Sequence, residues 1–324
     1  MTTTTLTAAP FDHQDFLSVA QLSVQDIQAV FRTAAELKAS RRLHDQVLRG
    51  RKIAMIFEKD SLRTRFTFDV GMQDLGGAAV FMDHRDARIG SRESIRDVAR
   101  NLERWVDGIV ARTFKHRVVT DLADYAGVPV INGLTDYLHP CQALSDIFTL
   151  HEHWDGQLKG KRLAYFGDGN NTCHSLIHTA AILGIDMVVC TPEGYEPNSK
   201  VVHEAMIATQ SSGSELTITN RIDEGIDGAQ AVYTDVWASM GQEDEVEERN
   251  GIFLEYQVNE ALMEKAEDSA LFMHCLPAHR GAEVTSPVID GDHSIVFDIA
   301  ENRLHIQKAL LVLLLGDQTG GLNS

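Results

Sequence analysis

Short apolar runs alternate with amphipathic runs along this chain, and the alternation restricts the possible folds more than any other feature. Four runs in the first half have the length and composition of buried strands: residues 51–59, 78–83, 107–113 and 128–134. The runs around them have helical periodicity: residues 23–48, 65–75, 94–106 and 118–126. Strands that alternate with helices predict a parallel sheet with right-handed crossovers.

A second series of the same kind follows a long helical run that begins near Pro140. Its strand-like runs are residues 161–169, 186–194, 216–220, 228–237 and 270–277, and its helical runs are 175–184, 199–208 and 259–266. A length of 324 residues is typical of two domains. We predict an α/β fold of two doubly wound parallel-sheet domains with a boundary near residue 150, and a packing helix over the apolar run 302–316.

The charge and the cysteines exclude several classes of protein. The chain carries 47 Asp and Glu against 29 Lys and Arg, a formal net charge of −18, so we expect neither nucleic acid nor a membrane as a partner. The four cysteines form no CxxC pair, the N-terminus lacks the features of a secretory signal, and no apolar run is long enough to span a membrane. We predict a cytoplasmic protein with reduced thiols.

Polar side chains follow the first predicted strand, where ligands bind in open α/β sheets. Ser61, Arg63, Thr64 and Arg65 stand at the start of a predicted helix, and a helix N-terminus offers unpaired N–H groups and partial positive charge. With the hydroxyls and an arginine fork, these residues would form a phosphate cradle. The alternative is a capping serine followed by two solvated arginines, and the pattern alone leaves both open.

The ends of later strands favour the cradle. Arg112 follows the third strand, and His139 and Gln142 stand at the next helix start. Each residue is a weak signal, but cationic and hydrogen-bonding groups at successive strand ends are typical of a site for an anion with a polarisable carbonyl.

The second series carries three further signals. Asp168 to Asn171 follow a strand as DGNN, a weak nucleotide fingerprint because no third glycine follows at the required spacing. Asp235 and Ser239 follow another strand and suit an ammonium ligand, or they cap a turn. Cys275 ends the next strand, where it is either a small buried hydrophobe or a substrate contact.

In order along the chain, the motifs are SLRTR at 61–65, HPCQ at 139–142, DGNN at 168–171, DVWASMG at 235–241, HCLP at 274–277 and ENR at 301–303. With these motifs the chain resembles the ornithine branch of the aspartate/ornithine carbamoyltransferase family along essentially its full length. The resemblance implies transfer of a carbamoyl group from carbamoyl phosphate to the side-chain amine of L-ornithine, a step of arginine metabolism. It also implies no metal or organic cofactor, and a homotrimer or a multiple of trimers.

The resemblance also implies roles for individual residues. The carbamoyl phosphate set is Ser61, Leu62, Arg63, Thr64, Arg88, Arg112, His139, Gln142, Cys275, Leu276 and Arg303. The ornithine set is Asn171, Asp235, Ser239 and Met240. The residues expected nearest the reacting atoms are Arg112, His139, Gln142, Asp235 and Cys275. Residues 1–150, with a C-terminal helix over 304–324 packing back on them, would bind carbamoyl phosphate, and residues 151–303 would bind ornithine across a cleft that closes.

Two positions depart from the family pattern. Leu62 replaces a common threonine, at a position where the family uses the backbone. Arg88 replaces a common glutamine that reaches carbamoyl phosphate, so that contact is open. Three alternatives stand beside ornithine transfer: transfer to another amine such as putrescine or an acylated ornithine, a non-catalytic binding protein on the same fold, and an NAD-dependent oxidoreductase. The last lacks a G-x-G-x-x-G motif.

Overall fold

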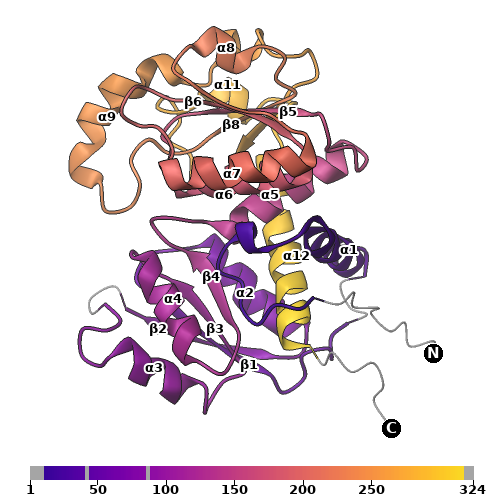
Figure 1. The fold of residues 1–324 in the computed structure, drawn as a ribbon, viewed down its shortest axis with the longest axis vertical. Coiled ribbons are helices and arrows are strands. Elements are labelled where there is room, and N and C mark those ends of the chain that lie inside the picture. Colours follow the sequence, from indigo (N-terminus) through magenta and orange to yellow (C-terminus); the bar gives the residue numbers. More distant parts are fainter. Residues whose placement is uncertain (1–10, 41–43, 85–87, 317–324) are drawn as a thin grey trace. The chain divides into compact units, whose positions relative to one another are not determined.

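The computed structural model describes residues 11–40, 44–84 and 88–316, and the chain divides into two compact units (Figure 1). Unit 1 contains the described residues up to Cys141 and from Arg303 onward, and unit 2 runs from Gln142 to Asn302. Unit 2 is therefore inserted into the chain of unit 1. The first crossing lies at Cys141, ahead of the position near residue 150 that the sequence suggested.

Unit 1 is built on a parallel sheet with the strand order β2-β1-β3-β4. Its strands are β1 (Lys52–Phe57), β2 (Ala78–Asp83), β3 (Gly108–Arg112) and β4 (Val130–Leu134). Its helices are η1 (Val19–Gln21), α1 (Val24–Ala39), α2 (Arg63–Asp74), α3 (Ile95–Leu102), α4 (His116–Tyr125), the first residues of α5 (Pro140–His153) and most of α12 (Val296–Leu315). The predicted four-stranded parallel sheet is confirmed.

Helices cover both faces of this sheet (Figure 1). The side chains of α3 and α4 pack on alternate strand residues such as Ala54, Ile56 and Ile109. On the other side α2 lies against α12, and Gly71 permits the contact because an added Cβ would lie 3.2 Å from Cγ of Lys308. The nearly continuous apolar runs of β1, β3 and β4 are therefore buried on both faces, as is usual in parallel sheets, whereas the edge strand β2 stays partly exposed.

The helix predicted over residues 23–48 ends early. A capping box of Ser23 and Asp26 begins α1, but the helix stops at Ala39 with Ser40 as its C-cap. Residues 44–50 form turns instead, in which the backbone N–H of Leu48 donates to the carbonyl of Leu75 at 2.8 Å. The prediction was wrong there because apolar spacing continued while the backbone bonded to the end of α2.

Unit 2 repeats the architecture with five parallel strands in the order β7-β6-β5-β8-β9. Its strands are β5 (Arg162–Phe166), β6 (Asp186–Cys190), β7 (Leu216–Thr219), β8 (Ala231–Thr234) and β9 (Leu271–His274). Its own helices are α6 (Asn171–Leu183), α7 (Ser199–Ser212), α8 (Ile222–Ile226), η2 (Glu243–Glu245), α9 (Val246–Phe253), η3 (Leu254–Tyr256), α10 (Glu260–Met263) and α11 (Ser286–Ile289).

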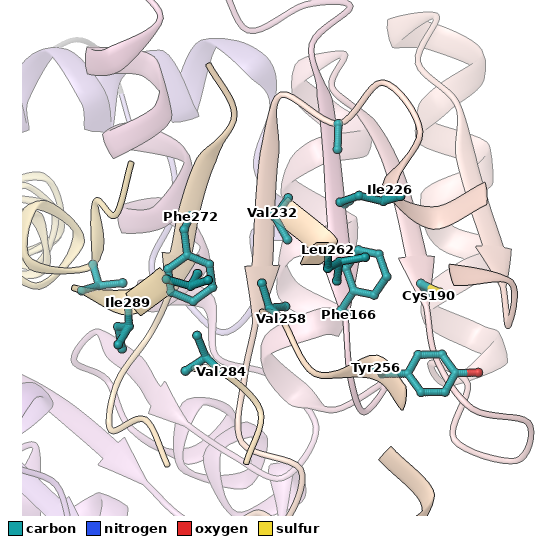
Figure 2. Close-up of a cluster of buried hydrophobic side chains, with 14 residues drawn as sticks. Phe166, Cys190, Ile226, Val232, Tyr256, Val258, Leu262, Phe272, Val284 and Ile289 are labelled. Atoms are coloured by element: carbon teal, nitrogen blue, oxygen red, sulfur yellow. The ribbon is translucent and has the colours of Figure 1, made fainter. Parts of the chain in front are cut away.

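A buried apolar cluster on one face of this sheet holds the short helices in place (Figure 2). Phe166, Val232 and Phe272 project from β5, β8 and β9 into it, and Ile226 and Leu262 meet them from α8 and α10. Burying one such side chain contributes about 1.5–3 kcal/mol. The sequence missed α8, α9 and α11 because they have four to eight residues, too few for a clear helical period.

The long helices α5 and α12 each contribute to both units, because the division falls within them. The helix α12 begins at Val296, earlier than the predicted start near residue 302, and ends at Leu315. The part of the prediction beyond residue 316 lies outside the described residues. Within the described ranges, a search for helices with the length and hydropathy needed to cross a bilayer found none.

Candidate functional site

The strand order of unit 1 brings three predicted site segments to one edge of its sheet. The chain leaves β1 toward β2 on one side and returns as β3 on the other, so β1 and β3 flank the point where the order reverses. Phe57 and Arg112, the last residues of these strands, are in register. The Ser61–Arg65 stretch and Arg112 therefore follow neighbouring strand ends, the usual place for a ligand in such a sheet.

The N-terminus of α2 is tied to the far end of the chain. The Ser61 hydroxyl accepts a hydrogen bond from the backbone N–H of Thr64 at 3.1 Å, which caps the helix. The Thr64 hydroxyl accepts one from Nη2 of Arg303 at 3.0 Å. Arg303 is 1% exposed, so this guanidinium is held inside unit 1 beside the helix start. Sequence motifs separated by more than two hundred residues thus meet.

His139 lies among the cationic groups of this rim. Burial is the largest cause of a pKa for His139 that lies well below its ordinary value. Four surrounding cations lower that pKa further: Arg303, Arg112, Arg63 and Lys59. The imidazole is therefore neutral at pH 7, and the charge that surrounds it favours an anion. Burial also raises the pKa of the neighbouring Cys141 thiol to about 12, so Cys141 stays protonated.

The sequence analysis missed Glu58, a buried carboxylate that organises this rim. Its two oxygens accept hydrogen bonds from the backbone N–H groups of Ile89 and Phe114, each at 3.0 Å. Its own N–H donates to the carbonyl of Arg112 at 2.8 Å. Glu58 therefore joins the turn after β2 to the end of β3, and its place directly after a strand was the available signal.

Arg88 lies in the turn that Glu58 holds. Its side chain is exposed, and its guanidinium carbon stands 4.3 Å from the centre of the Phe114 ring. Nζ of Lys59 lies 4.6 Å from the centre of the same ring and also forms an ion pair with Asp136. The structure thus places the exposed Arg88 against the aromatic ring that the buried Lys59 also contacts.

In unit 2 the corresponding reversal lies between β5 and β8. Phe166 and Thr234 are in register, and Thr234 is in register with His274 of β9. The three predicted segments that begin at Asp168, Asp235 and Cys275 therefore leave neighbouring strand ends. All three segments lie at one edge of one sheet.

Asp235 is the centre of a hydrogen-bonded group. Its Oδ1 accepts hydrogen bonds from Sγ of Cys275 at 3.0 Å and from the N–H of Val236 at 2.8 Å, and its Oδ2 accepts one from Nδ2 of Asn170 at 3.0 Å. Asn170 also caps α6 by accepting from the N–H of Thr172. These three hydrogen bonds hold the carboxylate in place. The sequence analysis emphasised Asn171 and missed Asn170, although DGNN contains both.

The residues after β9 adopt a strained backbone. Leu276 has φ +56°, the left-handed region that costs a residue with a side chain about 1–2 kcal/mol. Its N–H donates to Nδ1 of His274 at 2.8 Å, and Nε2 of His274 lies 3.2 Å from Glu283. Ligand atoms of Asp235, His274 and Cys275 lie within 4.8 Å of one another. Since both His274 nitrogens and the Cys275 thiol are engaged within the protein, these atoms form an internal network rather than a prepared metal site.

The predicted residues after Asp235 lie on an open loop. Met240 is 40% exposed, and the N–H of Ser239 donates to Oε1 of Gln242 at 2.9 Å. Leu62 in unit 1 is similarly exposed, at 67%. Neither Leu62 nor Met240 offers a buried side chain, in keeping with the backbone roles expected for them.

Gln142 belongs to unit 2 by its contacts, although the sequence placed it with residues 1–150. Its Nε2 donates to Oδ1 of Asp146 at 2.8 Å, and Oδ2 of Asp146 accepts from the Tyr233 hydroxyl at 3.1 Å. The structure therefore gathers Ser61, Arg63, Thr64, Arg112, His139 and Arg303 in unit 1, and Asn171, Asp235, Cys275 and Gln142 in unit 2.

Comparison with known proteins identifies the family. Residues 14–152 match the carbamoyl-P binding domain of aspartate/ornithine carbamoyltransferases, and residues 159–314 match their Asp/Orn binding domain. The chain belongs to the aspartate/ornithine carbamoyltransferase family. The two matches correspond to the two series of strands described above.

Individual family members are similar over nearly their whole length. The ornithine carbamoyltransferase of Carboxydothermus hydrogenoformans is 51% identical over 95% of this chain and 99% of its own. The solved ornithine carbamoyltransferase of Pyrococcus furiosus has a TM-score of 0.90 at 47% identity, covering 93% of this chain and 97% of its own. An acetylornithine transcarbamylase solved with acetylcitrulline has a TM-score of 0.86 at 30% identity, covering 94% and 100%. The fold thus holds members with different amine substrates.

Proposed function

We propose that this carbamoyltransferase family member transfers the carbamoyl group of carbamoyl phosphate to the side-chain amine of L-ornithine, giving L-citrulline and phosphate. The proposal rests on the combination of two sites in one chain. Unit 1 has a neutral histidine among four cations, and unit 2 has a hydrogen-bonded carboxylate. The chain is also 51% identical to an ornithine carbamoyltransferase. The first site suits a phosphate with a polarisable carbonyl, and the second suits an ammonium group.

On the donor side, we assign the phosphate to the N-terminus of α2. The backbone N–H groups there point along the helix axis and carry partial positive charge. Ser61, Arg63 and Thr64 would add hydroxyl and guanidinium donors, and Leu62 its backbone N–H. Arg303 would reach the same anion through the position that its bond to Thr64 fixes.

At the carbamoyl end, Arg112, His139 and Gln142 would polarise the carbonyl. A negative oxygen develops there as the amine adds, and donors aimed at that position lower the barrier; removing one costs about 10²–10³-fold in kcat in other enzymes. Because His139 is neutral, it would act as a hydrogen-bond donor rather than as a charged acid.

On the acceptor side, Asp235 and Asn171 would bind the amino-acid end of ornithine, with Ser239 and the Met240 backbone completing the set. Cys275 and the Leu276 backbone would lie beside the attacking amine. The side-chain ammonium group loses a proton to solvent and becomes an amine, and its nitrogen forms a bond to the carbamoyl carbon. The bond from that carbon to the phosphate oxygen then breaks, and the phosphate leaves with the electron pair and takes up the second proton from the nitrogen. Holding two substrates in line is worth about 7–11 kcal/mol.

The test is citrulline formation from carbamoyl phosphate with L-ornithine, N-acetylornithine and putrescine offered in parallel. Selective turnover of L-ornithine supports the proposal. Turnover of another amine would preserve the donor-side assignments and refute the acceptor-side ones. An absence of turnover together with tight carbamoyl phosphate binding would favour a non-catalytic protein, and Arg88→Gln would be the first reversion to examine.

We also propose a homotrimer or a multiple of it. Exposed apolar side chains of unit 1 support this: Leu62 and Phe66 on one side of α2 and Val80 and Met82 on one side of β2 are 44–67% exposed. Val80 and Met82 pair with Ala54 and Ile56 of β1 and so lie on the α3/α4 side of the sheet, while Leu62 and Phe66 lie at the start of α2 on the other side. Unit 1 therefore exposes apolar side chains on both sides of its sheet. Light scattering should give a trimer multiple for the wild type and smaller species for Phe66→Glu. A monomeric wild type would refute the proposal.

We place the reaction in the cytoplasm. The four cysteines are free thiols, and Cys141, Cys173 and Cys190 are buried, as in proteins of reducing compartments. Cell fractionation followed by immunodetection tests the assignment, and recovery from a membrane or an oxidising compartment would overturn it.

A further inference from the structure

We propose that Arg249 is a positioning residue for the amino-acid substrate. Arg249 lies on α9, outside every motif of the sequence, and holds the loop that runs from Asp235 to Gly241. This inference rests on the proposed function, since it assigns the support of the ornithine-binding loop rather than a new reaction.

The Arg249 guanidinium joins separate segments of unit 2. Its Nη1 donates to the backbone carbonyl of Trp237 at 2.9 Å and to Oδ2 of Asp168 at 3.2 Å. Its Nε donates to Oε2 of Glu245 at 2.7 Å. Trp237 stands between Asp235 and Ser239 in the chain. The bond to its carbonyl therefore fixes the backbone between two residues assigned to ornithine.

An aromatic cluster supports the same arrangement. The Arg249 guanidinium carbon lies 5.1 Å from the centre of the Tyr195 ring, within the range of a cation–π contact. Phe253, one turn further along α9, stacks on Trp237 with ring centres 5.9 Å apart and meets Tyr195 edge-on at 4.8 Å. The loop is thus held against α9 by its Trp237 ring and by its Trp237 carbonyl.

The charges show why an arginine is required at this position. Arg249 is 7% exposed, and burial disfavours its charged form, but the hydrogen bond to Glu245 and the charge of Asp168 leave its pKa raised. Burial raises the pKa of Asp168 to about 6, the Arg249 charge opposes that rise, and Asp235 adds to it. Arg249 thus offsets the repulsion between two carboxylates that share one strand edge, Asp168 and Asp235.

Loss of the guanidinium would release the Trp237 carbonyl and leave Asp168 without its cation. The loop would then sample positions in which Asp235, Ser239 and Met240 no longer converge. Since Arg249 is assigned no contact with carbamoyl phosphate, the defect should fall on ornithine binding. That selectivity separates positioning from a general loss of stability.

The experiment compares Arg249→Met, Arg249→Lys and Arg221→Met with the wild type. Arg221 provides the control because it forms an ion pair with Glu224 in the same unit while 74% exposed. We expect Arg249→Met to raise the KM for ornithine by about 30-fold or more, with a kcat change of less than about threefold and an unchanged Kd for carbamoyl phosphate. Arg249→Lys should give an intermediate KM, and Arg221→Met wild-type values.

Three outcomes decide the matter. An unchanged ornithine KM in Arg249→Met would overturn the positioning role, and so would an equal loss of carbamoyl phosphate binding, which would indicate general destabilisation. Should Arg249→Met not fold, Arg249→Lys and Asp168→Asn carry the same test, because each leaves part of the network. Failure of the wild type to convert ornithine would refute the proposed function instead, so the two failures are distinguishable.

Discussion

Each unit gathers charged residues at the carboxyl ends of its own strands, cations in unit 1 and carboxylates in unit 2. Each unit also buries one residue of the opposite charge beside them. In unit 1 the cationic rim around His139 is joined by the carboxylate of Glu58, which binds backbone N–H groups. In unit 2 the acidic rim of Asp168 and Asp235 is joined by the guanidinium of Arg249, which binds a backbone carbonyl and the Asp168 carboxylate.

This difference shows how each fold supports a site of one charge. Like charges brought together at a strand edge repel one another, and burial increases the cost because the local dielectric is low. A buried counter-charge that also bonds the backbone both reduces the repulsion and fixes the loops. Such a residue is assigned no substrate contact, yet its hydrogen bonds join the segments that form the site.

We expect the largest effect from removing a charge in the cationic rim of unit 1. Arg63→Ala removes a charge that faces His139 and the proposed phosphate, so kcat/KM for carbamoyl phosphate should fall by about 10²–10³-fold. Arg117→Ala is the matched control in the same unit, because Arg117 is 86% exposed and pairs with Asp121 outside the predicted site. Steady-state kinetics of both variants provide the measurement, and equal kinetics in the two would defeat the cradle assignment.

On the acidic side, Cys275→Ser tests the donor to Asp235. The shorter hydroxyl changes a hydrogen bond that measures 3.0 Å from Sγ to Oδ1. We expect the KM for ornithine to rise about tenfold, with little change in carbamoyl phosphate binding. Equal losses for both substrates, measured by kinetics and calorimetry, would make Cys275 structural.

Glu58→Gln tests the buried counter-charge of unit 1. Replacing one accepting oxygen by an NH₂ group leaves a backbone N–H facing a donor, so the free energy of unfolding should fall by about 1–3 kcal/mol. Glu103→Gln is the control, since Glu103 accepts from the N–H of Gly127 at 2.7 Å in a more exposed place. Denaturant titration compares the two, and an equal loss in both would show that Glu58 has no special role.

The KM for ornithine should depend on pH because of the acidic rim of unit 2. The pKa of Asp168 is raised to about 6 by burial, with Arg249 opposing the rise and Asp235 and Glu245 adding to it. Below that pH Asp168 becomes neutral and its attraction to Arg249 weakens, so the KM for ornithine should rise a few-fold as the pH falls through about 6. The pKa of Asp168 is higher in the folded protein than in the unfolded chain. Asp168 therefore contributes to the free energy of unfolding at low pH, and this contribution is lost as the pH rises through about 6.

Asp168→Asn separates this ionisation from that of the substrate amine. The ratio of wild-type to variant KM should change between pH 7 and pH 5 if Asp168 titrates there. A constant ratio over that range would assign the dependence elsewhere.

The smallest effect concerns Leu62. Its side chain is 67% exposed and only its backbone is assigned to the phosphate, so Leu62→Thr should change kcat/KM for carbamoyl phosphate by no more than about twofold. A tenfold change would show that the side chain itself reaches the substrate.

Local pattern was sufficient for features that depend on neighbours in the chain. The run AAVFMD gave β2 with its observed limits, and the strand-end positions of Ser61, Arg112, Asp235 and Cys275 followed from the order of strands and helices. The resemblance in motif supplied Arg303, whose partner Thr64 is remote in sequence.

Features that depend on burial were beyond the sequence. Glu58 directly follows a predicted strand and Arg249 lies outside every motif, and the role of each appears only in its hydrogen bonds to distant backbone groups. Asn170 was overlooked because its second partner, Asp235, follows another strand, far along the chain. Residues 44–50 were predicted as helix because the bond from Leu48 to the carbonyl of Leu75, which forms within these turns, joins positions far apart in the chain.

The insertion of unit 2 within unit 1 has a consequence for biosynthesis. A ribosome releases the chain from its N-terminus, and domains generally fold as they emerge. All of unit 2 leaves the ribosome before Arg303, so unit 1 waits for its last helix while unit 2 can already fold. The bond between Arg303 and Thr64 closes a chain separation of 239 residues. The anion site, whose motif is translated first, is therefore the last part of the molecule to be completed.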